Sequence, residues 1–140
     1  MVLDVFVEGC DDSFGCQYSG FGKFRCEIIR GWNEELGELY ESVLPDYSCS
    51  NYTLSKMNKI LDEYDKPYNE GMKLFFNHSD SDGEFTPAEC ELILKSFEHV
   101  DPEKFDKSDD YYNKWYRESY VVWIRMLKYA IENNKSILFG

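Results

Sequence analysis

A run of polar residues between two apolar segments carries side chains that could bind a metal ion. The string HSDSDGEFTPAE occupies residues 78–89, after the apolar residues MKLFF and Asn77. Calcium loops take their ligands from side-chain and backbone oxygens at alternate positions, with a glycine in the middle for a sharp turn. With Gly83 as that glycine, the spacing predicts a site for Ca²⁺ or another divalent cation. Its candidate ligands are His78, Asp80, Asp82, Glu84, Thr86 and Glu89.

The loop and the segment after it resemble the EF-hand family. Phe85 stands where that family has a buried apolar residue, and Cys90, Ile93 and Phe97 match apolar positions of its exiting helix. The resemblance implies a helix–loop–helix unit with Ca²⁺ in the loop. The first position departs from the family because it holds His78 instead of aspartate, and we find no second loop of this kind in the sequence. Since imidazole is a poor ligand for an oxygen-seeking cation, we expect weak binding.

The same residues allow two other interpretations. Thr86, Pro87 and Glu89 form a capping box with proline at the first helical position, which explains these three residues whether or not a metal binds. His78 and the loop carboxylates could also hold a transition metal or Mg²⁺ in a metal-dependent enzyme. No arrangement typical of nucleophilic catalysis accompanies them, so an enzyme is the less favoured class.

Negative charge is the strongest global property of the chain. Fifteen basic and 27 acidic residues give a formal net charge of −12. Residues 78–110 alone hold eleven acids and three lysines, a net charge of −8. This charge opposes direct nucleic-acid binding, and we expect a non-enzymatic protein that binds the basic surface of another protein. The partner-binding residues predicted in this segment, beyond the loop, are Glu91, Glu98, Asp101, Glu103, Asp106, Asp109 and Asp110.

A narrower alternative is a phage-type inhibitor. Its carboxylates would imitate nucleic-acid phosphates and block a host nuclease or defence enzyme. The motif HSDSDGEFTPAEC, the start VLDV and the segment YSGFGKFR resemble a scattered family of small bacterial and phage proteins of unassigned function. That resemblance covers most of the chain loosely and implies no chemistry.

Composition predicts one folded domain over residues 1–140. Hydrophobic residues make up 43% and aromatic residues 17%, which is too rich for a disordered acidic chain. We expect no membrane span, because no run of about 18 apolar residues occurs, and no signal peptide, because the start lacks a basic region. The five irregularly spaced cysteines predict reduced, unreactive thiols and a cytoplasmic location.

The elements that would position the loop follow from hydrophobic periodicity. Apolar alternation near the start predicts a strand over VLDVFVEG, and CDDSFGCQYSG reads as a loop. Helical spacing begins near Ser19, with Gly31 as the expected interruption, and Thr53 is a candidate cap for the next helix.

The second half of the chain predicts its longest helix. It would begin at a cap formed by Ser108 or Asp109 and end near Asn133, and SILFG would form a terminal strand. Tyr111 and Tyr129 are candidates for an exposed contact surface. The expected fold is mainly α within the α+β class. It has four to five helices and a small two- or three-stranded sheet formed by the N- and C-terminal strands.

Overall fold

The computed structural model describes residues 2–43, 51–63, 68–78 and 82–140. These ranges confirm the α+β class and contain six α-helices, a short 3-10 helix and one antiparallel sheet. The helices are α1 Tyr18–Trp32, α2 Glu34–Val43, α3 Asn51–Asp62, α4 Tyr68–Asn77, α5 Pro87–Phe97, η2 Pro102–Lys104 and α6 Asp110–Asn133. The strands are β1 Val2–Phe6, β2 Ser13–Gln17, β3 Gly83–Phe85 and β4 Ile137–Phe139.

The sheet has the order β2-β1-β4-β3. The predicted pairing of the terminal strands is confirmed, since Val5 lies opposite Phe139 and Phe6 opposite Leu138. The sheet has four strands instead of two or three, because two segments expected to be loops join it. Ser13–Gln17 pairs with all of β1, and Gly83–Phe85 adds an edge strand from inside the 78–89 loop.

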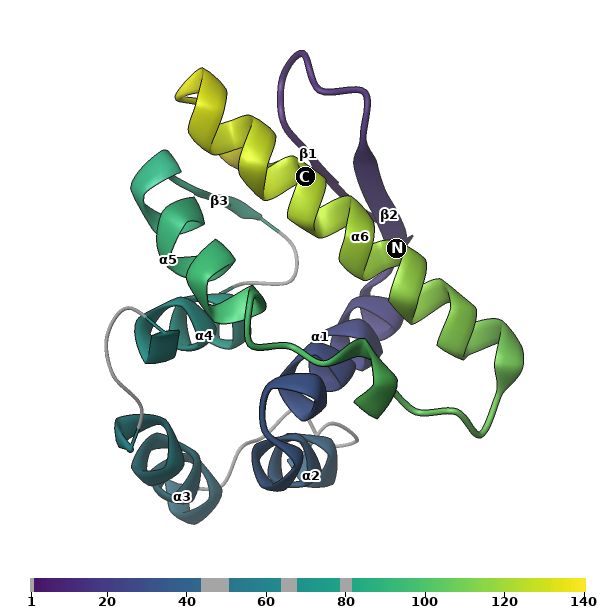
Figure 1. Ribbon diagram of the computed structural model, residues 1–140, viewed down its shortest axis with the longest axis vertical. Helices are drawn as coiled ribbons and strands as arrows, with labels where there is room; N and C mark the ends of the chain where they lie inside the picture. Colours follow the sequence, from purple (N-terminus) through teal and green to yellow (C-terminus); the bar gives the residue numbers. More distant parts are fainter. Residues whose placement is uncertain (1, 44–50, 64–67, 79–81) are drawn as a thin grey trace.

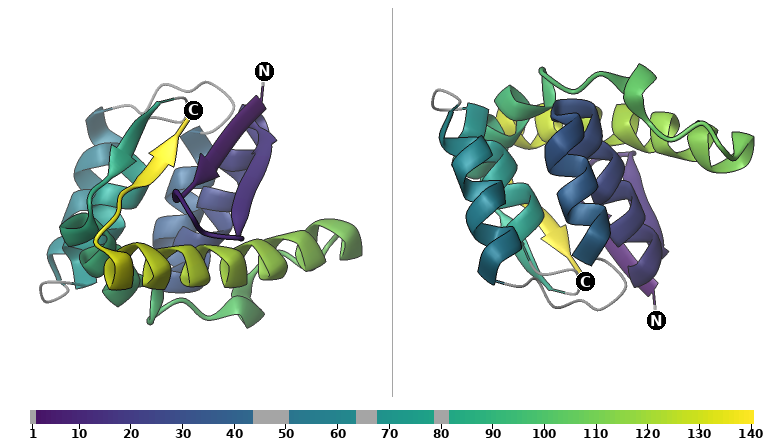
Figure 2. Two further views of the ribbon diagram at one scale, coloured as in Figure 1. Left: turned by 90° about the horizontal axis from the view of Figure 1, so that it is seen from above. Right: turned by 90° about the horizontal axis from the view of Figure 1, so that it is seen from below.

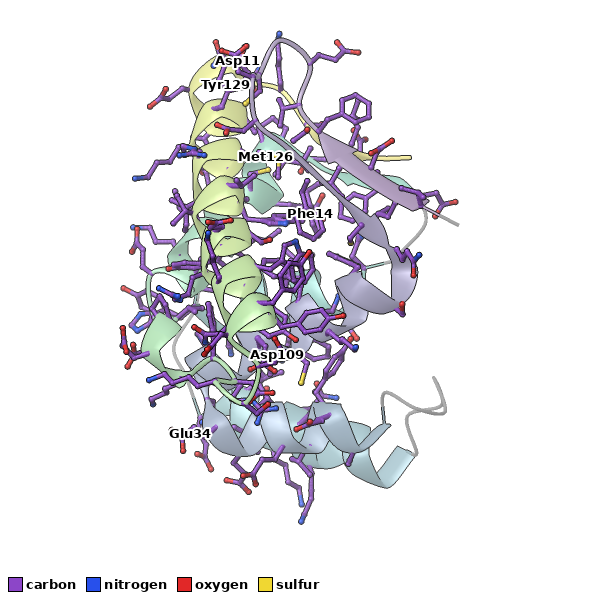
Figure 3. The ribbon with its side chains drawn as sticks, turned by 90° about the vertical axis from the view of Figure 1, so that its right-hand side faces the viewer. Asp11, Phe14, Glu34, Asp109, Met126 and Tyr129 are labelled. Atoms are coloured by element: carbon purple, nitrogen blue, oxygen red, sulfur yellow. The ribbon has the colours of Figure 1, made fainter. Side chains whose placement is uncertain are left out.

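One face of the sheet packs on helices, and the other is open. Figure 2 shows the strands side by side in front of the helices, with α6 running across the end of the layer. Burial alternates accordingly along β1, where Leu3 and Val5 are buried and Val2, Asp4 and Phe6 are exposed. The β1–β2 hairpin packs against α6. Phe14 of β2 points toward α6 and lies at this contact (Figure 3).

The core is built on aromatic rings around Trp123. This indole is fully buried, and seven phenylalanine rings have centroids between 5.5 and 6.5 Å from its own. These rings come from both halves of the chain, so the core joins strands and helices that are far apart in the sequence. They are Phe14, Phe21, Phe24, Phe75, Phe85, Phe97 and Phe139.

Two predicted helix boundaries are wrong. Gly31 lies inside α1, and the chain leaves the helix at Asn33, whose backbone is extended. Thr53 lies inside α3, which begins two residues earlier at Asn51. Gly31 has a packing role instead: a Cβ there would lie 2.9 Å from Val100 Cγ1 and 3.0 Å from the carbonyl oxygen of Asp101.

The predicted ends of α6 are confirmed. Asp109 is the N-cap, and its Oδ1 accepts hydrogen bonds from the N–H groups of Tyr111 at 2.9 Å and Tyr112 at 3.2 Å. Asn134 ends the helix in the left-handed conformation at φ 52°, which asparagine tolerates. Although α6 is the longest described helix, no helix in the described ranges is both long and apolar enough to cross a membrane.

Candidate functional site

The 78–89 loop joins α4 to α5, as the helix–loop–helix prediction requires. Gly83 has φ +98°, a conformation that glycine adopts without strain, and a Cβ there would lie 3.1 Å from Nε2 of His78. Gly83 therefore has a backbone conformation that favours glycine, and it is the first residue of β3. Asp80 lies outside the described residues, so its predicted ligand role stays a prediction.

The capping box at the end of the loop is confirmed. Thr86 Oγ1 accepts a hydrogen bond from the Glu89 N–H at 3.2 Å, and Glu89 Oε1 accepts one from the Thr86 N–H at 2.9 Å. Pro87 occupies the first helical position, where its missing N–H leaves no bond unmade. One carboxylate oxygen of Glu89 therefore accepts a backbone hydrogen bond at the start of α5.

His78 lies against β3, the strand inside the loop, and against β4. Its Nε2 lies 3.2 Å from the carbonyl oxygen of Glu84, and its ring centroid lies 4.3 Å from those of Phe85 and Phe139. The Glu84 carbonyl is the one that a calcium loop would offer to the ion. The Glu84 side chain is exposed, and Glu84 lies opposite Leu138 in the sheet. The histidine ring thus approaches the oxygen expected to face a cation.

The described donors do not form a metal-binding cluster. Across the described ranges, no group of three or more His, Cys, Asp or Glu side chains is placed to hold a metal ion. His78, Glu84 and Glu89 instead make contacts that stabilise the loop and the helix start. The six-ligand site that includes Asp80 stays a prediction, because Asp80 lies outside the described residues.

A groove of about 540 Å³ borders this loop. Its walls are largely apolar, with Leu74, Phe85 and Leu92 beside His78 and Glu89. The volume lies in the range of small-molecule sites. Lys73 at its edge forms an ion pair with Asp62 at 3.0 Å. The structure therefore brings two of the predicted ligand residues to one groove with an apolar wall.

The predicted partner-binding residues are all exposed, and six of them lie on one segment. We call residues 98–110 the acidic connection, since they link the end of α5 to the start of α6. The connection crosses α1 before α6 begins (Figure 1). Glu91 lies outside it, on the exposed side of α5. Both lysines of the connection already pair with carboxylates: Lys104 lies 3.8 Å from Glu34, and Lys107 lies 3.3 Å from Glu103.

Short polar turns give the acidic connection a defined shape. Asp101 caps η2 by accepting the N–H of Glu103 at 3.0 Å. Asp106 accepts hydrogen bonds from the N–H of Ser108 at 2.9 Å and from its hydroxyl at 3.0 Å. These two bonds lower the pKa of the Asp106 carboxyl, which therefore keeps its charge in mildly acidic solution.

Backbone hydrogen bonds attach the connection to α1 and α6. The Asp101 N–H donates to the carbonyl oxygen of Gly31 at 2.9 Å, and the Asp106 N–H donates to Glu27 Oε1 at 2.7 Å. Asn113 Nδ2 donates to the carbonyl oxygen of Asp106 at 2.9 Å. Phe105 is buried beneath the segment. The carboxylates of the connection are thus displayed on a fixed backbone.

Glu27 is a buried acid that was not among the predicted site residues. Its side chain is 6% exposed, and Oε1 lies 3.2 Å from Arg30 Nε. Arg30 Nη2 in turn lies 2.6 Å from Oε2 of Glu41 on α2. Burial raises the pKa of Glu27, against the opposing effects of the Asp106 N–H and Arg30. A glutamate inside the apolar run of α1, three residues before an arginine, was the signal available in the sequence.

A polar cavity of about 220 Å³ lies over Glu27. Its walls come from α1, α2, the acidic connection and the start of α6. Figure 3 shows Asp109 at the end of α6 that lies nearest α2, whose first residue is Glu34. The cavity is lined by Lys23, Cys26, Glu27, Glu41, Asp106, Ser108, Asp109, Tyr112 and Tyr116.

Three cysteines in the described part of the chain are thiols whose pKa is raised by burial. Cys10 and Cys16 are half-buried, Cys26 and Cys90 are buried, and all four are free thiols. Burial raises the pKa of Cys16 to about 11 and those of Cys26 and Cys90 to about 12. These three thiols stay protonated at neutral pH, as expected for inert cysteines. Cys49 lies outside the described residues.

Comparison of the chain with protein-family models, curated proteins and solved structures finds no match.

Proposed function

We propose that this protein is a non-enzymatic binding protein that contacts a basic surface of another protein through the acidic connection. The observation that carries the proposal is the attachment of this exposed, highly charged segment to α1 and α6. The hydrogen bonds from Asp101 to Gly31 and from Asp106 to Glu27 hold it across the α1 helix. A binding surface that is already ordered loses less conformational entropy on association than a disordered acidic tail.

The charge of the connection supports a basic partner. Six carboxylates and two lysines lie within 98–110, and both lysines are paired with acids. Like charges on adjacent surfaces repel one another, so this region opposes nucleic acid and acidic proteins and attracts basic ones. The attraction would raise the association rate and would weaken as salt is added.

Two exposed tyrosines at the end of the connection supply apolar contact area. Tyr111 is 75% exposed and Tyr112 is 41% exposed, and their ring centroids lie 5.5 Å apart. Tyrosine is enriched in protein interfaces because it buries a large ring and keeps a polar hydroxyl. The prediction that Tyr111 is exposed is confirmed, whereas Tyr129 is half-buried. We therefore place the centre of the contact surface at the start of α6.

The experiment measures binding of a short polybasic peptide of lysine and arginine by titration calorimetry. The test variant replaces three exposed acids of the connection: Glu98→Gln, Glu103→Gln and Asp110→Asn. The matched control replaces three exposed acids elsewhere: Glu38→Gln, Glu63→Gln and Glu132→Gln. Both variants change the formal net charge from −12 to −9, so only the location of the lost charge differs.

We expect the test variant to bind the peptide at least about tenfold more weakly than the control at roughly 50 mM salt. Binding by the unmodified protein should fall steeply between roughly 50 and 500 mM salt. Equal weakening by the two variants would mean that net charge, and not the acidic connection, determines binding. Affinity that does not change with salt would also overturn the proposal.

A further inference from the structure

The cavity over Glu27 has more negative than positive charge in and around its walls. Four carboxylates line it, from Glu27, Glu41, Asp106 and Asp109. The cations opposing them are Lys23 in the wall and Arg30, which pairs with Glu27 and Glu41 behind it. Two negative charges therefore remain in excess. Only Glu27 is buried, whereas Glu41, Asp106 and Asp109 are exposed and are screened by solvent.

The ionisation of Tyr116 reflects the same negative potential. Burial raises its pKa to about 12, and the charges of Glu27 and Asp106 add to the rise. A phenol loses its proton less readily where negative charge already surrounds it. The group that would lower the energy of this cavity is a cation.

Glu27 has an oxygen that could receive that cation. The Oε1 atom accepts the Asp106 N–H and faces Arg30, while no described residue forms a hydrogen bond to Oε2. A carboxylate can accept about four hydrogen bonds, so Oε2 can accept one from a donor placed in the cavity. The side chain lines the cavity, and Oε2 is not among the fully buried side-chain atoms of the described residues that lack a partner, so solvent and a donor in the cavity can reach it.

The aromatic wall of the cavity already holds one positive charge. Lys23 Nζ lies 5.1 Å from the ring centroid of Tyr112. The rings of Tyr112 and Tyr116 are stacked, with centroids 6.2 Å apart and planes inclined by 28°. A flat pair of rings beside carboxylates suits a planar guanidinium, which stacks on aromatic faces and donates in a fork to carboxylates.

We propose that this cavity binds the guanidinium group of an arginine side chain on the basic partner. The inference rests on the proposed function and names the group that the partner presents. The cavity of about 220 Å³ equals roughly seven water volumes of about 30 Å³, enough to admit the end of one arginine side chain. The arginine would donate to Glu27 Oε2 and to a second carboxylate of the wall.

The test uses small probes that carry one side chain each. ¹⁵N–¹H spectra of the whole protein are recorded during titration with N-acetyl-arginine methylamide. N-acetyl-citrulline methylamide, which has the same shape without the charge, is the neutral control, and N-acetyl-lysine methylamide tests for the guanidinium. We expect saturable shifts at the amides of Asp106, Ser108, Asp109 and Tyr112 with arginine, weaker effects with lysine and none with citrulline.

Two matched variants locate the binding site. Asp109→Asn removes a carboxylate of the cavity but keeps the α6 N-cap, since asparagine caps as well as aspartate. Glu132→Gln removes one exposed charge near the other end of the same helix. We expect Asp109→Asn to weaken arginine binding about tenfold, and Glu132→Gln to leave it unchanged.

Three results would overturn the inference. They are equal shifts with citrulline, equal binding of the lysine probe, and equal weakening by Asp109→Asn and Glu132→Gln. The outcome is separable from that of the proposed function. If peptide binding is weakened by the acidic-connection variant but the arginine probe does not shift the cavity amides, only the cavity inference fails. If the arginine probe binds but the polybasic peptide binds the connection variant as tightly as the control variant, the proposed function fails.

Discussion

The backbone N–H of Asp106 donates a 2.7 Å hydrogen bond to Oε1 of Glu27, which lies 79 residues earlier in the chain. This bond joins the acidic connection to the middle of α1, where Arg30 and Glu41 extend the polar network to α2. One buried side chain thereby fixes an exposed acidic segment. The geometry of the proposed binding surface depends on a residue that contributes little to that surface itself.

Two replacements of Glu27 distinguish the contribution of its hydrogen bond to stability from the contribution of its charge. Glu27→Gln keeps an oxygen for the Asp106 N–H and should change the free energy of unfolding by less than about 1.5 kcal/mol. Glu27→Ala leaves the N–H and Arg30 without this partner and should lower it by about 2–4 kcal/mol. Urea unfolding measures both values, and hydrogen exchange at the Asp106 amide should accelerate only in the alanine variant. Equal destabilisation by both replacements would show that the charge matters more than the bond.

Glu27 should also make stability depend on pH with a definite sign. Its folded-state pKa lies above the ordinary value of 4.5, chiefly because burial disfavours the carboxylate. The associated stability is fully present below the unfolded pKa and is lost as pH rises through the raised folded pKa. Relative to Glu27→Gln, which does not titrate, the unmodified protein should therefore lose free energy of unfolding as pH rises from 4 toward 7. A difference that is constant, or that grows in favour of the unmodified protein, would contradict this.

Asp106 should act in the opposite direction. Its folded-state pKa is lowered by the two hydrogen bonds from Ser108, so its contribution is present above the ordinary value of 3.8 and is lost as pH falls through the lowered pKa. The unmodified protein should lose stability on acidification through this group, and Asp106→Asn should lack that part of the loss. Thermal unfolding of both proteins between pH 2 and 5 measures it. The effect should be small, because the side chain is exposed.

The features predicted correctly from sequence are those whose causes are local. The Thr86 capping box, the Asp109 cap and the Asn134 end of α6 each depend on residues within one helical turn. Their side chains satisfy backbone groups at helix ends wherever the helix packs.

The features that sequence reasoning missed depend on partners outside their own segment of the chain. Gly83–Phe85 becomes a strand because it pairs with Ile137–Phe139, more than fifty residues away. Ser13–Gln17 resembled a loop because turn residues surround it, and its pairing with β1 overrides that local preference. Glu27 was missed for the same reason, since its role depends on the Asp106 N–H and on Arg30, which also pairs with Glu41 of α2. Local periodicity contains no information on such contacts.

The histidine at the start of the 78–89 loop can be tested as an obstacle to the Ca²⁺ binding that the loop spacing predicts. His78→Asp places a carboxylate at the first ligand position and removes the ring that approaches the Glu84 carbonyl. We expect this variant to gain a Ca²⁺-dependent rise in Tm that exceeds any rise in the unmodified protein. Thermal melts in EDTA and in Ca²⁺ measure it, and adding Asp82→Asn should reduce the gain. Identical responses before and after His78→Asp would remove the loop as a calcium site.

Two glycines of α1 should respond to alanine in opposite ways. At Gly31 a Cβ would lie 2.9 Å from Val100 Cγ1 and 3.0 Å from Phe105 Cε1, so the acidic connection must shift to admit it. Gly31→Ala should lower the free energy of unfolding by about 1–3 kcal/mol and accelerate hydrogen exchange at the Asp101 amide. At Gly20 the nearest atom would be Cys16 Cβ at 3.5 Å, an ordinary contact. Gly20→Ala should therefore raise the free energy of unfolding by about 0.5–1 kcal/mol, because alanine favours the helix. If Gly31→Ala also stabilised the protein, the close approach of the connection to α1 would not hold in solution, and neither would the fixed surface on which the proposed function depends.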